Sequence, residues 1–531
     1  MKKLLSMLLV LAMIMSLAAM GGSAIAAEGE QVLQLCQTMD GSSDKMGNPW
    51  NNINAINLVA LFRTLLLADY TLQEFSPSLA ESWDVSEDGL TYTFVMKDGL
   101  KWSDGEDLTA ADVAYSIKTN LRCATSNGNF TNAFNMIEGA SEYRDGTTDE
   151  LTGAVVDGNT LTITLTAPYA IFLPVIAQFA ILPEHATSDI DPLELHNSEY
   201  WLDPVVCGAF RLEEMSVGNY FTLVPNEYYE GTPWKIEKII VYFVPDQLTA
   251  VQAGQVDYIN FNAIDTINEV NKLDFMEMHP VDILFYRYFI CNMKGVDGNE
   301  NPVMQDKRVR EAVMHAIDRQ TLAEQLYPGL ATVIHSGVPM DYAEYDGVTF
   351  DYDPALAKQL LDEAGYDYNY DFRLLTYYSD QATVDFLDTI VYYLGEVGIN
   401  ARVITSTQGT TDLFDTRNYD LGYKGLSAFS IGEWYGEYAS TNANFRNIFG
   451  GDEQFDANAA AINAESDPAV RSQILTELQT LEEENLYKIP MFTLGNNVFI
   501  NTDHVKLPEG MVFGNPWYLS DRQLENWEIV G

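Results

Sequence analysis

Alternating and periodic apolar positions predict a chain that mixes strands and helices throughout its length. Apolar and polar residues alternate over 91–96 and 160–165, as expected for strands with one buried face. A more continuous apolar run over 238–244 predicts a strand that is buried on both faces. Segments with helical spacing of apolar residues lie between such runs. The order of elements therefore favours an α/β fold.

Three predicted helices have clear sequence signals at their ends. Thr109 with Asp112 forms a capping box, and Asp306 can cap a second helix. An Asp-Pro pair at 353–354 opens a third helix, which Gly365 closes. The residues expected on the buried faces are Val113, Ile117 and Leu121 in the first helix, Val309, Ala312, Val313, Ala316 and Ile317 in the second, and Leu356, Leu360, Leu361 and Ala364 in the third.

The first 26 residues have the pattern of an export signal. Lys2 and Lys3 precede an apolar run over 4–19, and the small residues that follow end in Ala24-Ile25-Ala26. The alternative is a membrane anchor, because the apolar run is only slightly shorter than a spanning helix. The small residues favour a signal peptide over 1–26 that is cleaved near Ala26. We expect no stable membrane insertion of the mature chain.

Size and charge narrow the class of protein. A chain of 531 residues is too long for one compact core, so two or three domains are expected. The 77 acidic residues outnumber 29 basic ones, and this imbalance disfavours nucleic acid and anionic membrane surfaces as partners. The charge is more typical of a solubilising surface than of a site for cationic ligands.

Cysteines and histidines give no sign of a metal or a cofactor. The four cysteines are far apart and form no C-x-x-C pair, so neither a structural zinc site nor a redox motif is supported. Disulfides and free thiols both remain open for an exported protein. The six histidines show no ligand spacing. The four cysteines are Cys36, Cys123, Cys207 and Cys291.

A set of short motifs follows a specific order and spacing along most of the chain. The first group reads PSLAESW at 77–83, DGLTYTF at 88–94, KDGLKWSDG at 97–105 and LTAADV at 108–113. The second group reads NEYY at 226–229, GQVD at 254–257, DKRVREAVMHAIDR at 306–319 and the Asp-Pro helix at 353–365. Together they resemble family 5 of the extracytoplasmic solute-binding proteins, which serve oligopeptide, dipeptide and nickel importers of the ABC type.

The resemblance implies a fold, a division into lobes and a function. The fold would be a two-lobed periplasmic-binding-protein-like fold of type II, with a hinge between the lobes and an extra subdomain in lobe one. Lobe one would span 27–285, completed by 492–531, and lobe two would span 286–491. The protein would be a monomer that is not an enzyme. It would capture a peptide or peptide-like ligand in the interlobe cleft by hinge closure and deliver it to the permease.

One departure from the family concerns the membrane anchor. Many members are lipoproteins that carry a cysteine after a Leu-Ala-Ala-like motif. In this chain, Leu17-Ala18-Ala19 is followed by Met20 and Gly21. Methionine cannot accept a thioether-linked lipid, so the resemblance implies an extracytoplasmic protein that is periplasmic or released rather than lipid-anchored.

A second departure concerns the ligand. In the oligopeptide branch, an aspartate pairs with the α-ammonium group of the peptide, and Phe429 stands at the matching position here. Glu433 could supply an acid nearby. Arg417 lies where the branch often has an arginine that reads a ligand carboxylate, and a solvated surface arginine is the alternative.

The same segment is rich in aromatic residues. Tyr423, Phe429, Trp434 and Tyr435 could stack on peptide side chains, sugars or other planar groups, and ordinary core packing is the alternative for them. An oligosaccharide is therefore one alternative ligand. A metal chelate is the other, because the six histidines show no ligand spacing and a metal would have to be carried by a small organic molecule.

Two other functional classes share some of these features. An enzyme is disfavoured, because the chain has no H-E-x-x-H zinc motif, no G-x-S-x-G elbow and no P-loop. A sensor or binding protein without a transport role would have the same fold and cleft, so the sequence leaves that alternative open.

Overall fold

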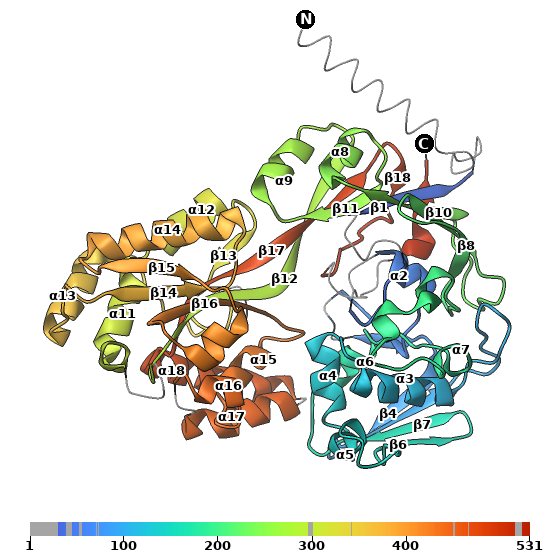
Figure 1. Cartoon of the computed structure of the whole chain (residues 1–531), viewed down its shortest axis with the longest axis horizontal. Coiled ribbons are helices and arrows are strands. Elements are labelled where there is room, and N and C mark those ends of the chain that lie inside the picture. Colours follow the sequence, from blue (N-terminus) through green and yellow to red (C-terminus); the bar gives the residue numbers. More distant parts are fainter. Residues whose placement is uncertain are drawn as a thin grey trace, which may run out of the picture.

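The computed structural model describes residues 30–38, 45–51, 56–70, 72, 74–295, 301–340, 342, 344–449, 452–465, 467–515 and 523–530. The predicted signal peptide and the segment that would hold a lipid-accepting cysteine lie outside these residues. Two α/β bodies, lobe one and lobe two, are joined by two long strands that run between them (Figure 1). The predicted two-lobed α/β fold is confirmed.

Lobe one is built on a four-stranded sheet of order β1-β10-β9-β8, in which β1 runs parallel to β10. The apolar run at 238–244 is strand β10, a central strand between β1 and β9, in which Ile239, Ile240, Val241 and Phe243 are buried. The strands are β1 (Val32–Thr38), β8 (Phe210–Ser216), β9 (Tyr220–Pro225) and β10 (Lys238–Val244).

An extra subdomain of lobe one contains a second sheet, of order β4-β5-β7-β6. The predicted capping box is present at the start of helix α3, and Val113, Ile117 and Leu121 on its inner face are buried. The elements of the subdomain are β4 (Ala80–Val85), β5 (Thr91–Met96), α3 (Ala110–Arg122), α4 (Gly128–Phe134), α5 (Ala140–Arg144), β6 (Ala154–Asp157) and β7 (Thr160–Thr164).

Strands β12 (Met276–Cys291) and β17 (Lys488–Asn501) form an antiparallel ladder that crosses from one lobe to the other (Figure 1). At the lobe-one end, β17 pairs with β11 (Tyr258–Phe261), and at the lobe-two end β12 pairs with β16 (Leu421–Ser427). The register of the ladder shifts between Asp282 and Phe285, and again between Arg287 and Tyr288. A β-bulge of this kind bends a strand locally and leaves the rest of the ladder intact.

Lobe two has helices on both faces of its part of this sheet. Phe289 of β12 contacts Phe386 of α14, whereas Tyr286 contacts Trp434 of α15. Residues an odd number of positions apart on a strand point to opposite faces, so these contacts define the two layers. The elements are α11 (Lys307–Ala316), α12 (Arg319–Leu326), β13 (Ala331–Val333), α13 (Pro354–Ala364), β14 (Phe372–Thr376), α14 (Gln381–Glu396), β15 (Ala401–Thr405), α15 (Gly432–Tyr435), α16 (Ala443–Arg446), α17 (Glu453–Ala464) and α18 (Pro468–Asn485).

The predicted helix ends in lobe two are confirmed. Asp306 caps α11, where its side chain accepts one backbone N–H, and Asp353 caps α13, where its side chain accepts two. Gly365 closes α13 in the left-handed conformation, with φ of 67°. The apolar residues predicted for the inner face of α11 are all buried. In α13, Leu361 is buried and the other predicted residues are partly exposed.

The chain returns to lobe one at its C-terminal end. Trp527 and Leu524 lie in the lobe-one core, and β18 (Val505–Lys506) pairs with β19 (Glu528–Ile529). The predicted limits of the lobes at residues 285 and 491 stay a prediction, although the register shift of β12 lies beside the first of them. None of the described helices combines the length and the apolarity that crossing a membrane requires.

Candidate functional site

The edge of lobe two that faces lobe one is formed where β14 and β16 end. These two strands are parallel, so the segments after them, 377–380 and 428–431, lie at the same edge of the sheet. Strand β12 runs in the opposite direction and brings Phe285 and Arg287 to this edge, opposite Ser427 and Gly425. In open α/β sheets, ligands bind outside the carboxyl ends of the strands. We therefore take this edge as the candidate ligand site.

The segment after β16 contacts lobe one directly. The side chain of Phe429 is 5% exposed and packs in the lobe-one core, although its backbone belongs to lobe two. Nearby, the backbone N–H of Ala170 in lobe one donates a hydrogen bond to the carbonyl of Asn463 in α17. Phe429 thus lies at the lobe junction, and its match to the family's acidic position and its role in ligand binding stay predictions.

The side chain of Glu433 is hydrogen-bonded to the backbone of the segment 428–431. Its Oε1 atom accepts hydrogen bonds from the backbone N–H groups of Phe429 at 2.6 Å and Ser430 at 2.9 Å. Burial raises the pKa of the Glu433 carboxyl to about 7, although these two N–H groups favour its charged form. Burial and the nearby Glu433 also raise the pKa of Tyr169 in lobe one. The structure therefore places Phe429 and Glu433 together at the junction.

The raised pKa of Glu433 predicts a pH-dependent stability. The folded protein holds this proton more tightly than the unfolded chain, so the free energy of unfolding falls as pH rises from 4.5 to about 7. We expect a loss of about 2 kcal/mol over this range, which Glu433→Gln removes. Urea unfolding of both proteins across the range measures the difference.

The exposed Glu87 provides a matched control for this measurement, because Glu87→Gln changes the same functional group at the surface. Its pH profile should follow that of the wild type. A Glu433→Gln protein with the wild-type pH profile would show that burial of this carboxyl has no effect on stability.

Three of the predicted aromatic residues lie in the lobe-two core. Tyr423 is 0% exposed, and its ring contacts Phe289 and Phe386. Trp434 and Tyr435 are equally buried and belong to the same core. Their predicted role in ligand binding stays a prediction, and in this structure they pack the interior beneath the junction.

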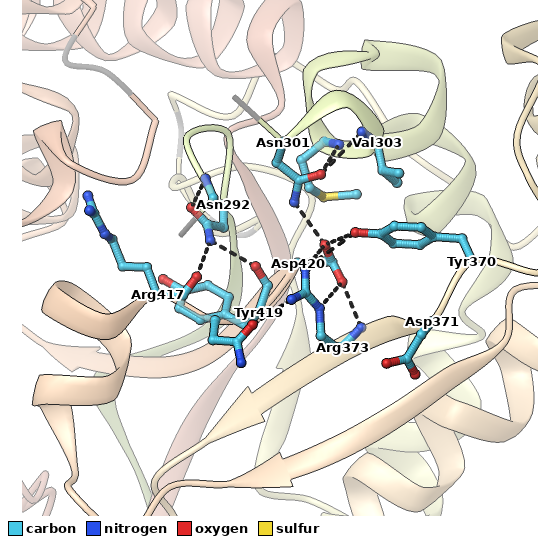
Figure 2. Close-up of polar contacts among 12 residues, drawn as sticks. Asn292, Asn301, Val303, Tyr370, Asp371, Arg373, Arg417, Tyr419 and Asp420 are labelled. Atoms are coloured by element: carbon cyan, nitrogen blue, oxygen red, sulfur yellow. Dashed lines mark hydrogen bonds and ion pairs between the residues drawn. The ribbon is translucent and has the colours of Figure 1, made fainter. Parts of the chain in front are cut away.

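Arg417 lies at the other end of β16, far from the junction. Strand β16 begins at Leu421 and reaches the junction only at Ser427, about 20 Å further along at the usual rise per residue. Arg417 points away from the neighbouring polar cluster in Figure 2, and its Nη1 atom donates to the carbonyl of Asn447 at 2.5 Å. Its role as a reader of a ligand carboxylate stays a prediction.

Asp420 is the centre of the polar cluster in Figure 2. This carboxylate is fully buried and accepts hydrogen bonds from Tyr370, Asn301 and the guanidinium of Arg373, at 2.8 to 3.1 Å. It also accepts from the backbone N–H of Arg373 at 2.8 Å. The cluster joins the beginnings of β14 and β16, so it orders the sheet end opposite the junction.

A second buried cluster joins α15 and its neighbours to the sheet. Glu437 forms ion pairs with Lys424 at 2.9 Å and Lys488 at 2.8 Å, and it accepts a hydrogen bond from the hydroxyl of Tyr288. Burial alone would raise the pKa of Glu437, but the two ammonium groups outweigh burial and hold the pKa at about 2. Lys488 is 0% exposed, so its buried ammonium group depends on Glu437 to balance its charge.

Arg287 at the junction edge was not singled out in the sequence. Its guanidinium carbon lies 4.3 Å from the ring centre of Tyr378, 4.6 Å from that of Phe285 and 5.3 Å from that of Tyr423. Phe285 in turn packs against the lobe-one core. The sequence did hold a signal for it, because Arg287 is the one charged residue in the apolar run 283–291.

Cysteines and metal ligands add no further site within the part of the chain that the structure describes. There, no group of three or more His, Cys, Asp or Glu residues is placed to hold a metal ion. The four cysteines are free thiols in this structure, so the alternative of disulfide bonds is not realised in it. Burial raises the pKa of Cys207 and Cys291 to about 12, which keeps both thiols protonated.

Comparison with known proteins identifies relatives of this chain. The model of the family described as bacterial extracellular solute-binding proteins, family 5 (middle region), matches residues 74–456. A protein of Brucella ovis, provisionally named as an ABC transporter peptide-binding protein, is 30% identical over 348 residues, which are 65% of this chain and 62% of the relative. The glutathione-binding protein GsiB of Salmonella typhi is 28% identical over 61% of this chain and 60% of GsiB.

A solved structure supports the same assignment of the fold. Lactococcal OppA, complexed with an endogenous peptide in the closed conformation, superposes with a TM-score of 0.73 at 18% identity, covering 93% of this chain and 99% of OppA. The family model matches well over half of the chain, and the two-lobed architecture agrees with it. This chain therefore belongs to family 5 of the bacterial extracellular solute-binding proteins.

Proposed function

We propose that this chain captures a peptide or a peptide-like small ligand between its lobes and delivers it to the permease of an ABC importer. The observation that carries the proposal is the family match over 74–456. The relatives named as peptide-binding and glutathione-binding proteins support the ligand class. The match spans 62% of the first of these relatives, so the ligand and the permease are proposed for this chain.

The mechanism we propose is closure of the lobes about β12 and β17. These two strands form the ladder that crosses the junction, and the register shift of β12 at Asp282–Phe285 supplies a local bend there. A ligand that contacts both lobes does so only when they are closed, and it therefore shifts the population toward the closed form. The permease would then recognise the closed arrangement.

Further parts of the proposal concern the state of the protein in the cell. We propose that it acts by binding rather than by catalysis, and as a monomer. We also propose that the signal peptide is cleaved near Ala26 and that the mature protein is periplasmic or released without a lipid anchor. The lack of a cysteine after Leu17-Ala18-Ala19 supports the last point.

Thermal unfolding and calorimetry with defined ligands test this function. The mature protein would be titrated with glutathione and with tripeptides to pentapeptides. Binding at a hundredfold excess over the dissociation constant adds about 2.7 kcal/mol of stability, which is readily seen as a rise in Tm. A rise with an oligosaccharide or a metal chelate, and with no peptide, would contradict the proposed ligand class.

A further inference from the structure

Arg287 occupies an aromatic cage at the edge of lobe two. The side chain is 8% exposed, and its guanidinium lies over the rings of Phe285, Tyr378 and Tyr423. Gly425 lies opposite it on β16, and a Cβ atom there would come within 2.9 Å of its Nη1 atom. The missing side chain at Gly425 therefore makes the space in which the guanidinium sits.

The guanidinium is not satisfied by this cage. Its Nε and Nη1 atoms are buried and have no hydrogen-bond partner in the described structure. The titratable side chains that act on it most strongly are tyrosines, with no carboxylate among them: Tyr423, Tyr378, Tyr327 and Tyr377. The hydroxyl of Tyr423 is likewise buried without a partner. The two side chains are neighbours, since the guanidinium carbon of Arg287 lies 5.3 Å from the centre of the Tyr423 ring.

Two other buried arginines show how this protein satisfies such a group when the role is structural. Arg319 is 3% exposed and donates to the carbonyls of Ile334, Pro490 and Phe350. Arg310 is 4% exposed and donates to carbonyls at the end of α18 and at the end of α10 (Pro302–Gln305). Arg287 differs from both. The aromatic faces around it attract its positive charge, but they accept no hydrogen bonds from the N–H groups in the plane of the guanidinium.

A buried cation with unused donors carries a cost that an incoming anion can remove. Leaving a buried donor unpaired is expensive, and more so for a charged group. We propose that Arg287 is the anchor for a carboxylate group of the ligand at the lobe junction. This inference rests on the proposed function. It adds that the ligand carries a negatively charged carboxylate at the end that contacts lobe two.

The surroundings define the chemistry of that ligand further. One guanidinium among tyrosine and phenylalanine rings suits one planar carboxylate joined to an apolar or aromatic group. The other buried ammonium groups of lobe two, on Lys424 and Lys488, already pair with Glu437 and are not free for a second anion. The free C-terminal carboxylate of a short peptide fits this description.

Matched peptides that differ only in this carboxylate test the proposal. Each tripeptide to pentapeptide would be titrated by calorimetry as the free acid and as the C-terminal amide. The wild type should prefer the acid by about tenfold to a hundredfold, as expected for hydrogen bonds to a charged group. Arg287→Met should lose this preference, and Arg287→Lys should keep part of it. Equal affinity for acid and amide in the wild type would overturn the proposal.

The stability of the ligand-free variants gives a readout that does not depend on finding a ligand. A binding residue held with unused donors destabilises the free protein, so Arg287→Met should leave Tm unchanged or raise it by about 2 °C. Arg319→Met is the matched control and should lower Tm strongly, because it strands carbonyl groups that Arg319 now satisfies. A comparable fall in Tm for Arg287→Met would show a structural role and overturn the inference.

The two measurements separate failure of the inference from failure of the proposed function. If the wild type binds peptides but does not distinguish acid from amide, the function stands and the anchor role falls. If the wild type binds none of the peptides, the proposed ligand class falls, and the Tm of Arg287→Met then decides whether Arg287 is an anion anchor or a structural residue.

Discussion

Replacing Glu437 with leucine is expected to lower the free energy of unfolding by about 3–5 kcal/mol, because it leaves two buried ammonium groups without their shared partner. Lys488 is fully buried and Lys424 is nearly so, and both pair with this carboxylate. Urea unfolding near neutral pH measures the loss. The depressed pKa of Glu437 means that its contribution is present above pH 4.5 and is lost as pH falls through about 2.

A double variant identifies the cause of this loss. Replacing both Glu437 with leucine and Lys488 with methionine removes the cation that the single variant strands, and leaves Lys424 at a slightly exposed position. The double variant should be more stable than Glu437→Leu alone, with a coupling energy of at least about 1.5 kcal/mol. Additive losses would contradict the view that the two charges depend on each other.

Asp420→Asn is expected to lower the free energy of unfolding by about 3 kcal/mol. The substitution places an amide N–H₂ group among donors that now all point at a carboxylate, and it removes the charge that pairs with Arg373. Thermal and urea unfolding measure the effect. Peptide binding by the protein that remains folded should change little, because the cluster lies at the sheet end opposite the junction.

Asp371 is the matched control for this cluster. It directly precedes β14, at the same end of the sheet, but no dashed line joins its side chain to the cluster in Figure 2, and it pairs with Arg402 at the surface. Asp371→Asn should leave Tm within the error of the wild type, since exposed ion pairs contribute little. Equal losses for the two variants would show that burial does not distinguish these aspartates.

Local sequence signals predicted many elements correctly because they depend on neighbouring residues alone. The capping box at Thr109, the Asp caps of α11 and α13 and the glycine that ends α13 are all short-range chemistry. The pairing of β12 with β17 joins residues about 210 positions apart in the chain and has no local signal. The two lobes were therefore expected from the resemblance, whereas the ladder that joins them was seen only in the structure.

The role of the predicted site residues in ligand binding stays a prediction, but their positions can be compared with the structure. The segment around Phe429 and Glu433 does reach the lobe junction, since it follows the end of β16. Aromatic content could not distinguish a ligand-binding surface from a hydrophobic core. Tyr423, for example, is a buried core residue whose hydroxyl has no hydrogen-bond partner. Arg287 was missed because its importance lies in what it lacks, namely acceptors for its N–H groups, and partners in space cannot be counted from sequence.

A distance measured between the lobes tests the central claim of ligand capture by closure. Spin labels would be placed on cysteines that replace Val155 in β6 and Tyr392 in α14, which are 55% and 61% exposed. The native thiols are buried or partly buried, and burial raises the pKa of Cys36 and Cys123 to about 12, so they should label slowly. A saturating free-acid peptide should shift the distances to one shorter, narrower population. An unchanged distribution at saturation would contradict capture by closure.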